Sequence, residues 1–357
     1  MLFMVASASR RTSITATAVL LSAVVWLHAS PATSVALSQT PSPGRAIALT
    51  FDDLPFMAAG GAYFPDATRA TAKLLDVLKR HKAPAVGFVN EWQLDVAGDR
   101  PARVALLRQW IDAGMTLGNH TYSHTDFNRL TAAQFEAEIV KGDPTVRQLM
   151  APRNPPRLFF RHPMTHTGNT REKKEAIEQV LASRGYVVAP HTIENSDFIF
   201  NIVYRRALGA DPARATKVRN AYLEHTDAAS RFAESISAQI FGREVAQTLL
   251  VHSNALNADT LDALLVRYEA HGYRFITLED AMADPAYATK DTVVSESGPT
   301  WLWRWMKSLG LNLSFREDPE VPAWVLEEYK QISNRMFAAR AWAWSPGAAG
   351  NQKEAAR

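Results

Sequence analysis

The sequence of 357 residues contains no cysteine, and this absence excludes several kinds of site and crosslink. Without thiols the chain can form no disulfide, cysteine-ligated zinc site, iron–sulfur cluster or cysteine nucleophile, and it has no cysteine that could carry an N-terminal lipid. A zinc site in this chain must therefore use histidine and carboxylate ligands.

A large excess of one charge is also missing. The chain has 39 Lys and Arg against 36 Asp and Glu, a formal charge of +3, but residues 1–38 hold two arginines and no acidic residue, so the remainder carries only +1. No basic cluster is longer than the stretch at 171–174, whereas nucleic-acid binders use clustered Lys and Arg to displace counterions. These features argue against a nucleic-acid partner, and the mean hydropathy of −0.17 excludes a multi-span membrane protein.

The N-terminal region has the order of a secretory signal peptide. Arg10 and Arg11 precede an apolar run at 14–27, and small residues follow it. We expect a signal peptide over residues 1–38, with an uncleaved membrane anchor as the alternative, although the run is shorter than the ~20 residues of a membrane span. A secreted chain without cysteine suits a bacterial periplasm or cell envelope, and we expect no stable membrane insertion after cleavage.

From residue 45 onward, short β-rich apolar runs alternate with helical patterns, which predicts an α/β fold. The predicted strands are 46–51, 85–89, 115–119, 158–160, 187–189, 248–251 and 275–277. The predicted helices include 65–81, 100–113, 131–150, 170–184 and 257–270. Seven strands with helices between them fit a closed or nearly closed parallel barrel, and a doubly wound open sheet is the alternative. In either fold, functional residues belong at the carboxyl ends of the strands.

Several local signals mark helix ends. Gly185 and Gly272 suit the left-handed position after a helix, and Thr131 and Thr170 suit the N-cap position, the first in a capping-box pattern. Pro144 is expected to kink or end the helix predicted at 131–150.

Residues 286–357 form a segment rich in tryptophan, which we expect to pack on the barrel as a C-terminal extension. Residues 346–357 are rich in Gly, Ala and polar side chains and are expected to fray. An alternative is that Trp301, Trp303 and Trp305 lie on one face of a strand and form a platform that binds sugars. Six of the nine tryptophans lie in this segment: Trp301, Trp303, Trp305, Trp324, Trp342 and Trp344.

Titratable residues follow the first and third predicted strands. Asp52 and Asp53 are adjacent carboxylates, which repel each other unless they share a cation or a proton. Adjacent side chains of an extended segment point in different directions, so one can bind a metal while the other faces a substrate. His120 and His124 have the i, i+4 spacing of one face of a helical turn. One carboxylate and two histidines leave positions open for water and substrate, as a catalytic metal site requires.

Further polar residues follow three later strands: Arg161, Asp197 and His252. Each alone fits an ordinary structural role, such as a surface ion pair, a helix cap or a buried histidine. Together with the residues at the first two strand ends, they would lie at one rim of the barrel, and this joint pattern indicates a functional site.

Two neighbouring histidines, His162 and His166, could touch a substrate. The remaining ones are interpreted as structural or surface residues: His81, His191, His225 and His271.

Five motifs occur in order over residues 45–285: TFDD at 50–53, HTYSH at 120–124, FRHP at 160–163, DF at 197–198 and LLVH at 249–252. In these motifs the sequence resembles the polysaccharide deacetylase family, the NodB-homology domain of carbohydrate esterase family four. The resemblance implies a distorted (β/α)7 barrel over 45–285, followed by the extension at 286–357.

The resemblance also implies a metal site and a general base. Asp53, His120 and His124 would bind a divalent cation, zinc first, with cobalt, nickel and manganese as alternatives. Asp52 would take a proton from water, and Arg161 would hold it ionised through a charge-assisted hydrogen bond.

The remaining implied residues concern the acid and the substrate. His252 would protonate the departing amine, with Asp197 raising its pKa and fixing its orientation. A backbone N–H at Met164 or Thr165 would stabilise the oxyanion. Substrate contacts are implied for Phe198, Pro163, Met164 and Thr165. Phe198 stands where the family has Trp, and the residues after Pro163 lack the aromatic that is common there.

The sequence therefore predicts a secreted, metal-dependent hydrolase that removes N-acetyl groups from an amino-sugar polymer or oligomer, with O-acetyl groups as a variant. One alternative is an amidase of the same fold that acts on a non-carbohydrate C–N bond. The other is a catalytically silent glycan-binding protein. The sequence does not indicate an oligomeric state.

Overall fold

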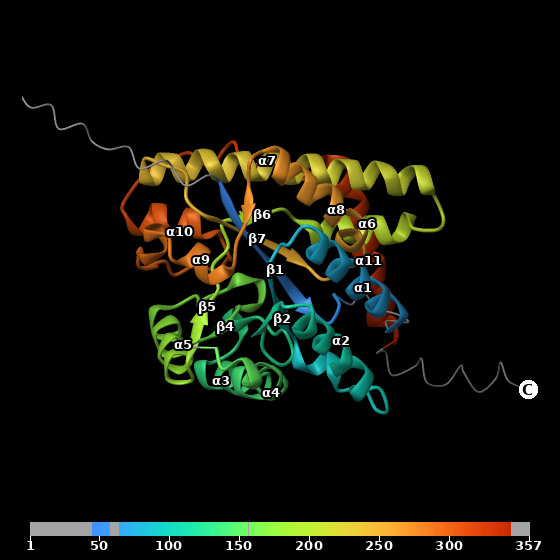
Figure 1. Ribbon diagram of the computed structural model, residues 1–357, viewed down its shortest axis with the longest axis horizontal. Helices are drawn as coiled ribbons and strands as arrows, with labels where there is room; N and C mark the ends of the chain where they lie inside the picture. Colours follow the sequence, from blue (N-terminus) through green and yellow to red (C-terminus); the bar gives the residue numbers. More distant parts are fainter. Residues whose placement is uncertain (1–44, 58–63, 156, 344–357) are drawn as a thin grey trace, which may run out of the picture. The chain divides into compact units, whose positions relative to one another are not determined.

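The structure is a computed structural model that describes residues 45–57, 64–155 and 157–343 (Figure 1). The signal peptide predicted at 1–38 and the fraying predicted at 346–357 lie outside these residues. No helix within the described ranges is both long enough and apolar enough to cross a membrane.

A parallel sheet forms the centre of the fold. Its strands are β1 (Ala46–Leu54), β2 (Ala85–Val89), β3 (Thr116–Asn119), β4 (Leu158–Phe160), β5 (Tyr186–Val188), β6 (Ile193–Glu194), β7 (Gln247–His252) and β8 (Arg274–Phe275). The spatial order is β5-β4-β3-β2-β1-β7-β6, and β8 pairs with the first residues of β1.

This order identifies a barrel that is open along one seam. From β1 the strands follow chain order through β5 on one side and run back through β7 to β6 on the other. A doubly wound sheet would reverse direction at a switch point, so that alternative is wrong. Between β5 and β6 no strand pairing occurs in the described chain, so the sheet remains unclosed there. The predicted α/β barrel class is confirmed.

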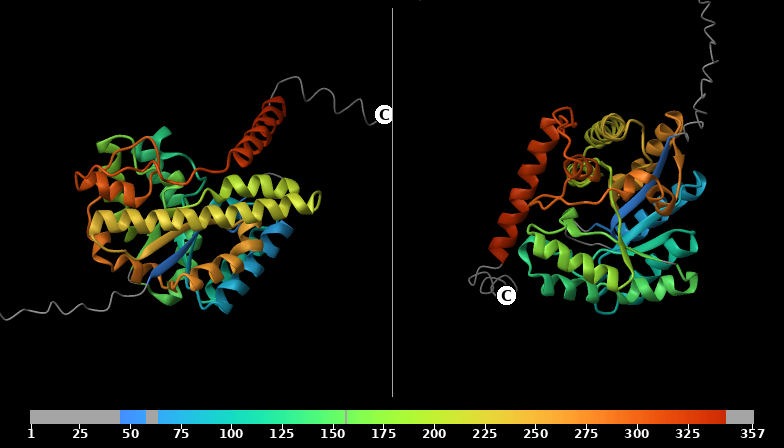
Figure 2. Two further views of the ribbon diagram at one scale, coloured as in Figure 1. Left: turned by 90° about the horizontal axis from the view of Figure 1, so that it is seen from above. Right: turned by 90° about the vertical axis from the view of Figure 1, so that its left-hand side faces the viewer.

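Helices surround the strands, as the three ribbon views show (Figures 1 and 2). They are α1 (Phe64–Arg80), α2 (Arg100–Asp112), α3 (Ala132–Lys141), α4 (Pro144–Met150), α5 (Arg171–Ser183), α6 (Asp197–Ala207), α7 (Pro212–Phe241), α8 (Ala255–Ala270), α9 (Leu278–Met282), α10 (Trp301–Ser308) and α11 (Ala323–Ala343). Short 3₁₀ turns occur at η1 (Glu91–Leu94), η2 (Phe127–Arg129), η3 (Ala151–Arg153), η4 (Pro163–Thr165) and η5 (Pro285–Ala288).

The local signals at helix ends are confirmed. Gly185 and Gly272 have φ angles of 73° and 79°, the left-handed values that favour glycine. Thr131 forms the complete capping box with Gln134, and the Thr170 hydroxyl accepts from a backbone N–H of α5. Pro144 ends the predicted long helix and begins a new one, so that region contains α3 and α4.

Other elements differ from the prediction. Seven strands are predicted, and residues 212–241 are not among the helices named from the sequence, whereas β6 is an eighth strand and α7 has 30 residues. The buried side of α7 mixes apolar Val218 and Tyr222 with Thr226, Ser230 and Ser237. Small polar residues on the buried side weaken the apolar periodicity by which a helix is predicted.

The central strand β1 is buried on both faces. Ile47, Leu49 and Phe51 pack into the core between the sheet and the outer helices, where the Phe51 ring meets the edge of Trp110 at 5.4 Å. Ala48 faces a second cluster with Phe88 and residues of α9. Burial on both sides agrees with the continuous apolar run from which the strand was predicted.

The tryptophans at 301–305 lie on helix α10. Trp301 and Trp305 are 8% and 1% exposed, and Trp305 packs edge-on against Phe241 of α7 and Tyr287 of η5. The three tryptophans do not share a strand face, so the sugar-platform alternative is wrong: i, i+4 spacing on a helix turns two of them into the core.

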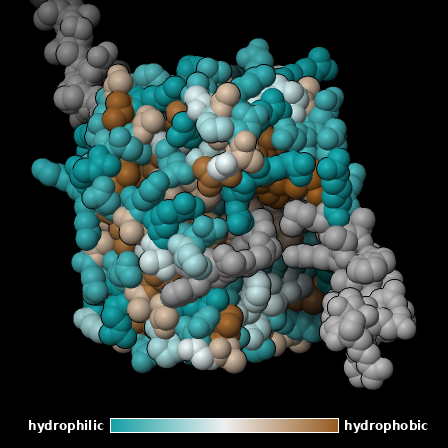
Figure 3. Space-filling model, turned by 90° about the vertical axis from the view of Figure 1, so that its right-hand side faces the viewer, coloured by the Kyte–Doolittle hydropathy of each residue, from teal (hydrophilic) through white to brown (hydrophobic). Residues whose placement is uncertain are grey.

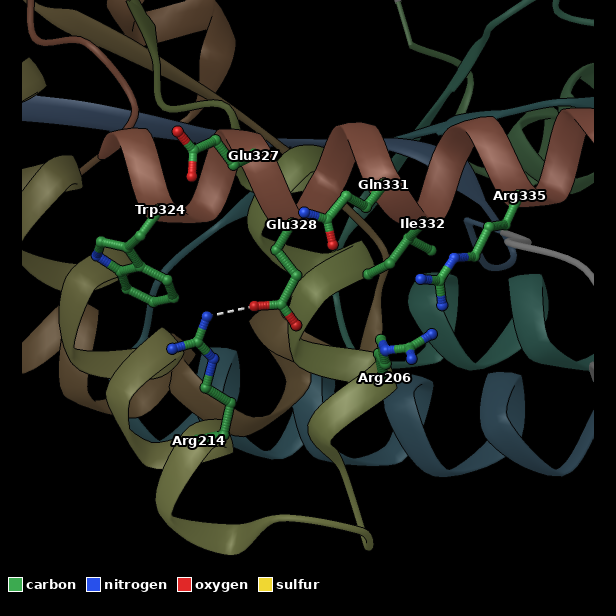
Figure 4. Close-up of a pocket in the computed structure, with 8 residues that line it drawn as sticks. All are labelled: Arg206, Arg214, Trp324, Glu327, Glu328, Gln331, Ile332 and Arg335. Carbon is green, nitrogen blue, oxygen red and sulfur yellow. Dashed lines mark hydrogen bonds and ion pairs between the residues drawn. The ribbon is translucent and has the colours of Figure 1, made fainter.

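Helix α11 packs against α6 and α7. Figure 4 shows Glu328 of α11 pairing with Arg214 of α7, and the Trp324 ring lies 4.3 Å from the Arg214 guanidinium. Lys217 approaches the same ring at 4.7 Å. Cations over an aromatic face and an ion pair thus add to the apolar contacts of this helix.

The surface drawn in Figure 3 is mainly hydrophilic, with hydrophobic residues interspersed. Large hydrophobic side chains that are exposed lie on separate elements, among them Trp92 of η1 at 45% and Val266 of α8 at 51%. Exposed apolar residues of this kind are ordinary. Met164, 48% exposed, is different because it lies at the cavity described below.

The buried position of Trp305 predicts a large effect of its removal. We expect Trp305→Ala to lower the free energy of unfolding by about 3–5 kcal/mol, because it leaves a cavity between α7, α10 and η5. Trp92→Ala is the control and should cost less than about 1 kcal/mol. Urea unfolding followed by circular dichroism measures both, and equal losses would show that α10 does not belong to the core.

Candidate functional site

A cavity of about 410 Å³ lies at the carboxyl ends of the strands. Eight of the eleven predicted site residues line it, and they come from β1, β7, α6 and the loops after β3 and β4. Arg161, Asp197 and Pro163 are buried and are not among the lining residues. The described lining consists of Asp52, Asp53, Met57, His120, His124, Met164, Thr165, His191, Glu194, Ser196, Phe198, Leu250, His252 and Gly298.

Asp53, His120 and His124 converge on one point. Asp53 Oδ1 lies 3.6 Å from His120 Nε2 and 3.4 Å from His124 Nε2, and one ligand atom from each residue lies within 4.8 Å of the others. The predicted helical turn between the histidines is wrong. They lie in a loop in which Thr121 and His124 have left-handed φ angles of 69° and 58°. The Asn119 carboxamide accepts from Thr121 N–H at 2.7 Å and fixes the start of this loop.

The donor set fits a divalent cation. His120 Nδ1–H donates to the Arg161 carbonyl at 2.7 Å, so the lone pair of Nε2 faces Asp53. Burial holds the pKa of His120 well below its usual value, which keeps the imidazole neutral as a ligand must be. Asp53 Oδ1 is buried and accepts no hydrogen bond from the described residues. A carbonyl behind a ligating histidine is the usual second contact of metal-binding imidazoles.

The two adjacent carboxylates face the same imidazole. Asp52 Oδ2 lies 3.7 Å from His120 Nε2, close to the 3.6 Å of Asp53 Oδ1. The expectation that the two side chains diverge is wrong, because Asp53 has a φ of 64° and is not extended. Asp52 is 3% exposed and so stands beside the ligand set within the cavity wall.

Arg161 does not form the predicted hydrogen bond with Asp52. Its Nε lies 3.9 Å from Asp52 Oδ1, an ion-pair distance, while Nη2 donates to the Thr50 hydroxyl at 2.9 Å. Thr50 thus fixes the guanidinium, which also lies 5.0 Å from the Phe88 ring. Burial raises the pKa of Asp52, and the attraction of Arg161 opposes that rise without cancelling it.

Asp197 and His252 form a buried pair. Asp197 accepts from His252 Nδ1 at 2.7 Å, from His252 N–H at 2.9 Å and from the Asn254 and Asn257 carboxamides at 2.7 and 2.5 Å. Burial would lower the pKa of His252, but the attraction and hydrogen bond of Asp197 outweigh it and raise this pKa to about 10. His252 is therefore protonated at neutral pH, with Nδ1 bound to Asp197 and Nε2 left for other partners.

The predicted substrate contacts surround the same cavity. The Phe198 ring stands edge-on to His252 at 6.0 Å and gives the cavity an apolar wall. Met164 and Thr165 line another side, and both have a φ of 53°. The N–H of Thr165 already donates to the His162 carbonyl at 3.0 Å. Of the two N–H groups predicted for the oxyanion, that of Met164 is therefore the better candidate.

Six of the described lining residues are absent from the predicted site: Met57, His191, Glu194, Ser196, Leu250 and Gly298. His191, interpreted as structural or surface, is fully buried, and neither ring nitrogen has a hydrogen-bond partner in the described chain. Glu194 accepts from Ser196 N–H at 2.7 Å, and burial raises its pKa. Both follow β5 closely, so the strand-end rule applies to them too. Gly298 comes from the extension, where no sequence signal indicates a site.

His162 and His166 lie away from the cavity lining. His162 stacks on Phe135 with ring centroids 5.7 Å apart and planes 6° apart, and burial holds its pKa well below its usual value. His166 Nδ1 pairs with Asp126 Oδ1 at 2.7 Å. The suggestion that these histidines touch a substrate is therefore not supported by their positions. Of the histidines interpreted as structural, His225 packs against Phe200.

Comparison with known families supports the motifs. The polysaccharide deacetylase family model matches residues 39–189, which contain the TFDD, HTYSH and FRHP motifs. The resemblance to the polysaccharide deacetylase family is confirmed for this segment. The polysaccharide deacetylase match ends before Asp197 and His252, which the fold brings to the same cavity.

Curated relatives agree with this family. The chain is 36% identical over 97 residues to a chitin deacetylase of Colletotrichum lindemuthianum, covering 27% of this chain and 33% of that one. It is 28% identical over 103 residues to a peptidoglycan-N-acetylglucosamine deacetylase of Bacillus cereus, covering 29% and 31%. The chain thus spans about a third of the curated relatives it matches.

A solved chitin deacetylase from the fungal pathogen Colletotrichum lindemuthianum also aligns with the chain. The TM-score is 0.45 at 22% identity, with 67% of this chain and 88% of that chain covered.

The convergence of Asp53, His120 and His124 predicts metal binding. We expect the purified protein to bind one zinc ion per chain and His120→Ala to lose it on dialysis, because two ligands rarely hold a structural or catalytic zinc. Elemental analysis measures the content. His271→Ala, at an exposed position outside the cavity, is the matched control and should keep the metal. Full zinc content in His120→Ala would remove this residue from the ligand set.

Proposed function

We propose that the protein is a metal-dependent hydrolase that removes N-acetyl groups from an amino-sugar polymer or oligomer. The observation that carries the proposal is the composition of one cavity. It holds a ligand set for a divalent cation, with a buried carboxylate beside it and a protonated histidine in the same wall. A base, an acid and a cation are the groups that amide hydrolysis by water requires.

The ligands are Asp53, His120 and His124, and zinc is the proposed ion. When bound, a divalent cation supplies Lewis-acid chemistry, since it polarises a carbonyl and makes water more acidic. The chain orients this site through the Arg161 carbonyl, which holds Nδ1 of His120.

Asp52 is proposed as the general base. Its buried carboxylate lies beside His120 and next in sequence to Asp53, so it can take a proton from a water molecule held at that point. Burial makes it a stronger base than an exposed aspartate, because the raised pKa reflects a carboxylate that binds protons more tightly. The ion pair with Arg161 opposes this rise in the pKa of Asp52 and favours the ionised carboxylate.

His252 is proposed as the general acid. Asp197 holds Nδ1, so Nε2–H can protonate the amide nitrogen while its bond to the acetyl carbon breaks. Acetate and a free amine are the products, and the proton that Asp52 takes from water balances the one that His252 gives. A histidine whose tautomer and orientation are fixed by a buried carboxylate suits this role.

The remaining contacts position the acetyl group. The N–H of Met164 is the proposed donor to the oxyanion, and Phe198 is the proposed wall for the acetyl methyl group. Phe198 keeps that wall apolar. Its shape differs from the Trp usual in the family, so the acyl preference is a property to measure.

The proposed location is the periplasm or cell envelope. This rests on the sequence order of residues 1–38, which is that of a signal peptide. Acetylated glycans are the substrates named for the chitin and peptidoglycan deacetylases to which the chain is similar.

Acetate release tests the function directly. We expect zinc-loaded protein to release acetate from chitin oligomers, peptidoglycan or acetylated exopolysaccharide. Asp52→Asn should lower kcat by about 10²–10⁴-fold, since it removes a general base, while it keeps its zinc. Turnover of small amides without release from any glycan would favour a non-carbohydrate amidase. Full activity in Asp52→Asn would refute Asp52 as the base.

The Asp197–His252 pair predicts the alkaline side of the pH profile. His252 must be protonated to act, and its folded-state pKa of about 10 keeps it protonated until the pH rises through that value. Asp197→Asn removes the attraction that opposes burial, so the alkaline limb of kcat/KM should move down by about one pH unit or more. Asp262→Asn, at an exposed ion pair on α8, is the control. An unmoved limb would exclude His252 as the titrating acid.

A further inference from the structure

We propose that residues 291–305 of the extension are part of the active site, and that Arg304 is a positioning residue for the turn at Met164 and Thr165. The proposal rests on the proposed function only for its catalytic consequence. Its structural claim is that the extension sets the conformation of this turn.

The turn needs support from outside. Met164 and Thr165 are consecutive residues with left-handed φ angles of 53°, and Thr165 is β-branched. Such residues are strained in this region and persist only where the surrounding structure holds them. The turn's own hydrogen bonds, from Thr165 N–H to His162 and from His166 N–H to Pro163, are ordinary backbone contacts.

Arg304 supplies that support from α10. It is fully buried, and its Nη2 donates to the Thr165 carbonyl at 2.9 Å while Nη1 donates to the Thr167 hydroxyl at 2.9 Å. Asp291 balances its charge at 3.1 Å and also pairs with Lys174 of α5 at 2.9 Å. A planar guanidinium with several fixed donors holds a loop in one geometry, which a flexible ammonium cannot do as well.

Gly298 packs closely against the same turn. The Thr165 hydroxyl donates to the Gly298 carbonyl at 2.7 Å. A Cβ at position 298 would lie 2.0 Å from both the Met164 carbonyl oxygen and Thr165 Oγ1, so any larger residue would displace the turn. Gly298 is also one of the described cavity residues, which places the extension in the wall of the site.

The extension also covers the open seam of the barrel. Trp301 N–H donates to the His191 carbonyl at 2.8 Å, and the Trp301 ring meets the His191 ring edge-on at 5.4 Å. His191 lies between β5 and β6, the two strands that do not pair. Residues 298–304 thus contact both the turn after β4 and the segment between β5 and β6, where the strands do not pair.

The barrel and the extension therefore support different groups of the site. The barrel strands hold the ligand set, the base and the acid, whereas the extension fixes the N–H proposed to bind the oxyanion. Loss of one oxyanion donor lowers kcat by about 10²–10³-fold in enzymes of known mechanism. Displacing the turn should therefore lower kcat while metal binding and KM change little.

Hydrogen exchange and kinetics test the proposal together. In the full-length protein, Arg304→Met should speed amide exchange in peptides covering 162–168 by at least about tenfold and lower kcat by about 10²-fold, with zinc content unchanged. Gly298→Ala should lower kcat in the same way while all charges remain, and Arg304→Lys should recover part of the loss.

Controls separate this role from general destabilisation. Arg316→Met and Asn312→Ala change exposed residues of the same extension outside 291–305 and should alter neither exchange at 162–168 nor kcat. Unchanged exchange in both Arg304→Met and Gly298→Ala would overturn the proposal, as would a change in KM and zinc content without a change in kcat. If wild-type protein releases no acetate, the proposed function fails, and the exchange data alone decide whether the extension holds the turn.

Discussion

The pairing of β1 with β7 is the constraint on which the site depends. In the parallel register of these strands, Asp52 stands opposite His252 at the last paired position. The proposed base and the proposed acid, 200 positions apart in sequence, are thereby brought to the same edge at the centre of the sheet. A shift of one residue in this register would turn one of the two side chains to the other face. The apolar residues buried on both faces of β1 make such a shift costly.

The burial of charged side chains at the cavity determines their pKa values and the hydrogen bonds that they need. Asp52, Arg161, Asp197 and His252 all line the cavity or lie beside a residue that does, where an unpaired charge is expensive. Asp197 accepts four hydrogen bonds, and its negative charge raises the pKa of His252. Asp52 keeps a buried oxygen that accepts no hydrogen bond from described residues. Asp197 is thus fully hydrogen-bonded within the protein, whereas this oxygen of Asp52 has the Arg161 guanidinium near it, at an ion-pair distance of 3.9 Å.

The sequence was sufficient for the barrel class and for eight of the fourteen described residues that line the cavity, because both follow from regular patterns. Strands as apolar as β1 and β7 can be recognised from composition, and polar residues at their carboxyl ends are expected to meet. Helix α7 was missed because Thr226, Ser230 and Ser237 interrupt its apolar side, although Asp211 and Pro212 at its start and Gly242 at its end are ordinary boundary signals. Gly298 could not be placed, because its contact with Met164 depends on how the extension packs.

Side-chain directions within the site were the least predictable feature, and backbone conformation gives the reason. Eight non-glycine residues of the described chain have positive φ angles, and five of them line the cavity: Asp53, His124, Met164, Thr165 and Ser196. Sequence spacing assumes regular geometry, so it predicted a helical turn for the histidines and diverging carboxylates. Strained residues gather where function requires a geometry that regular elements do not offer. Each needs neighbours that hold it, such as Asn119 for the histidine loop and Arg304 for the turn at Met164. The conformation of the cavity is therefore a property of its supporting contacts as much as of its motifs.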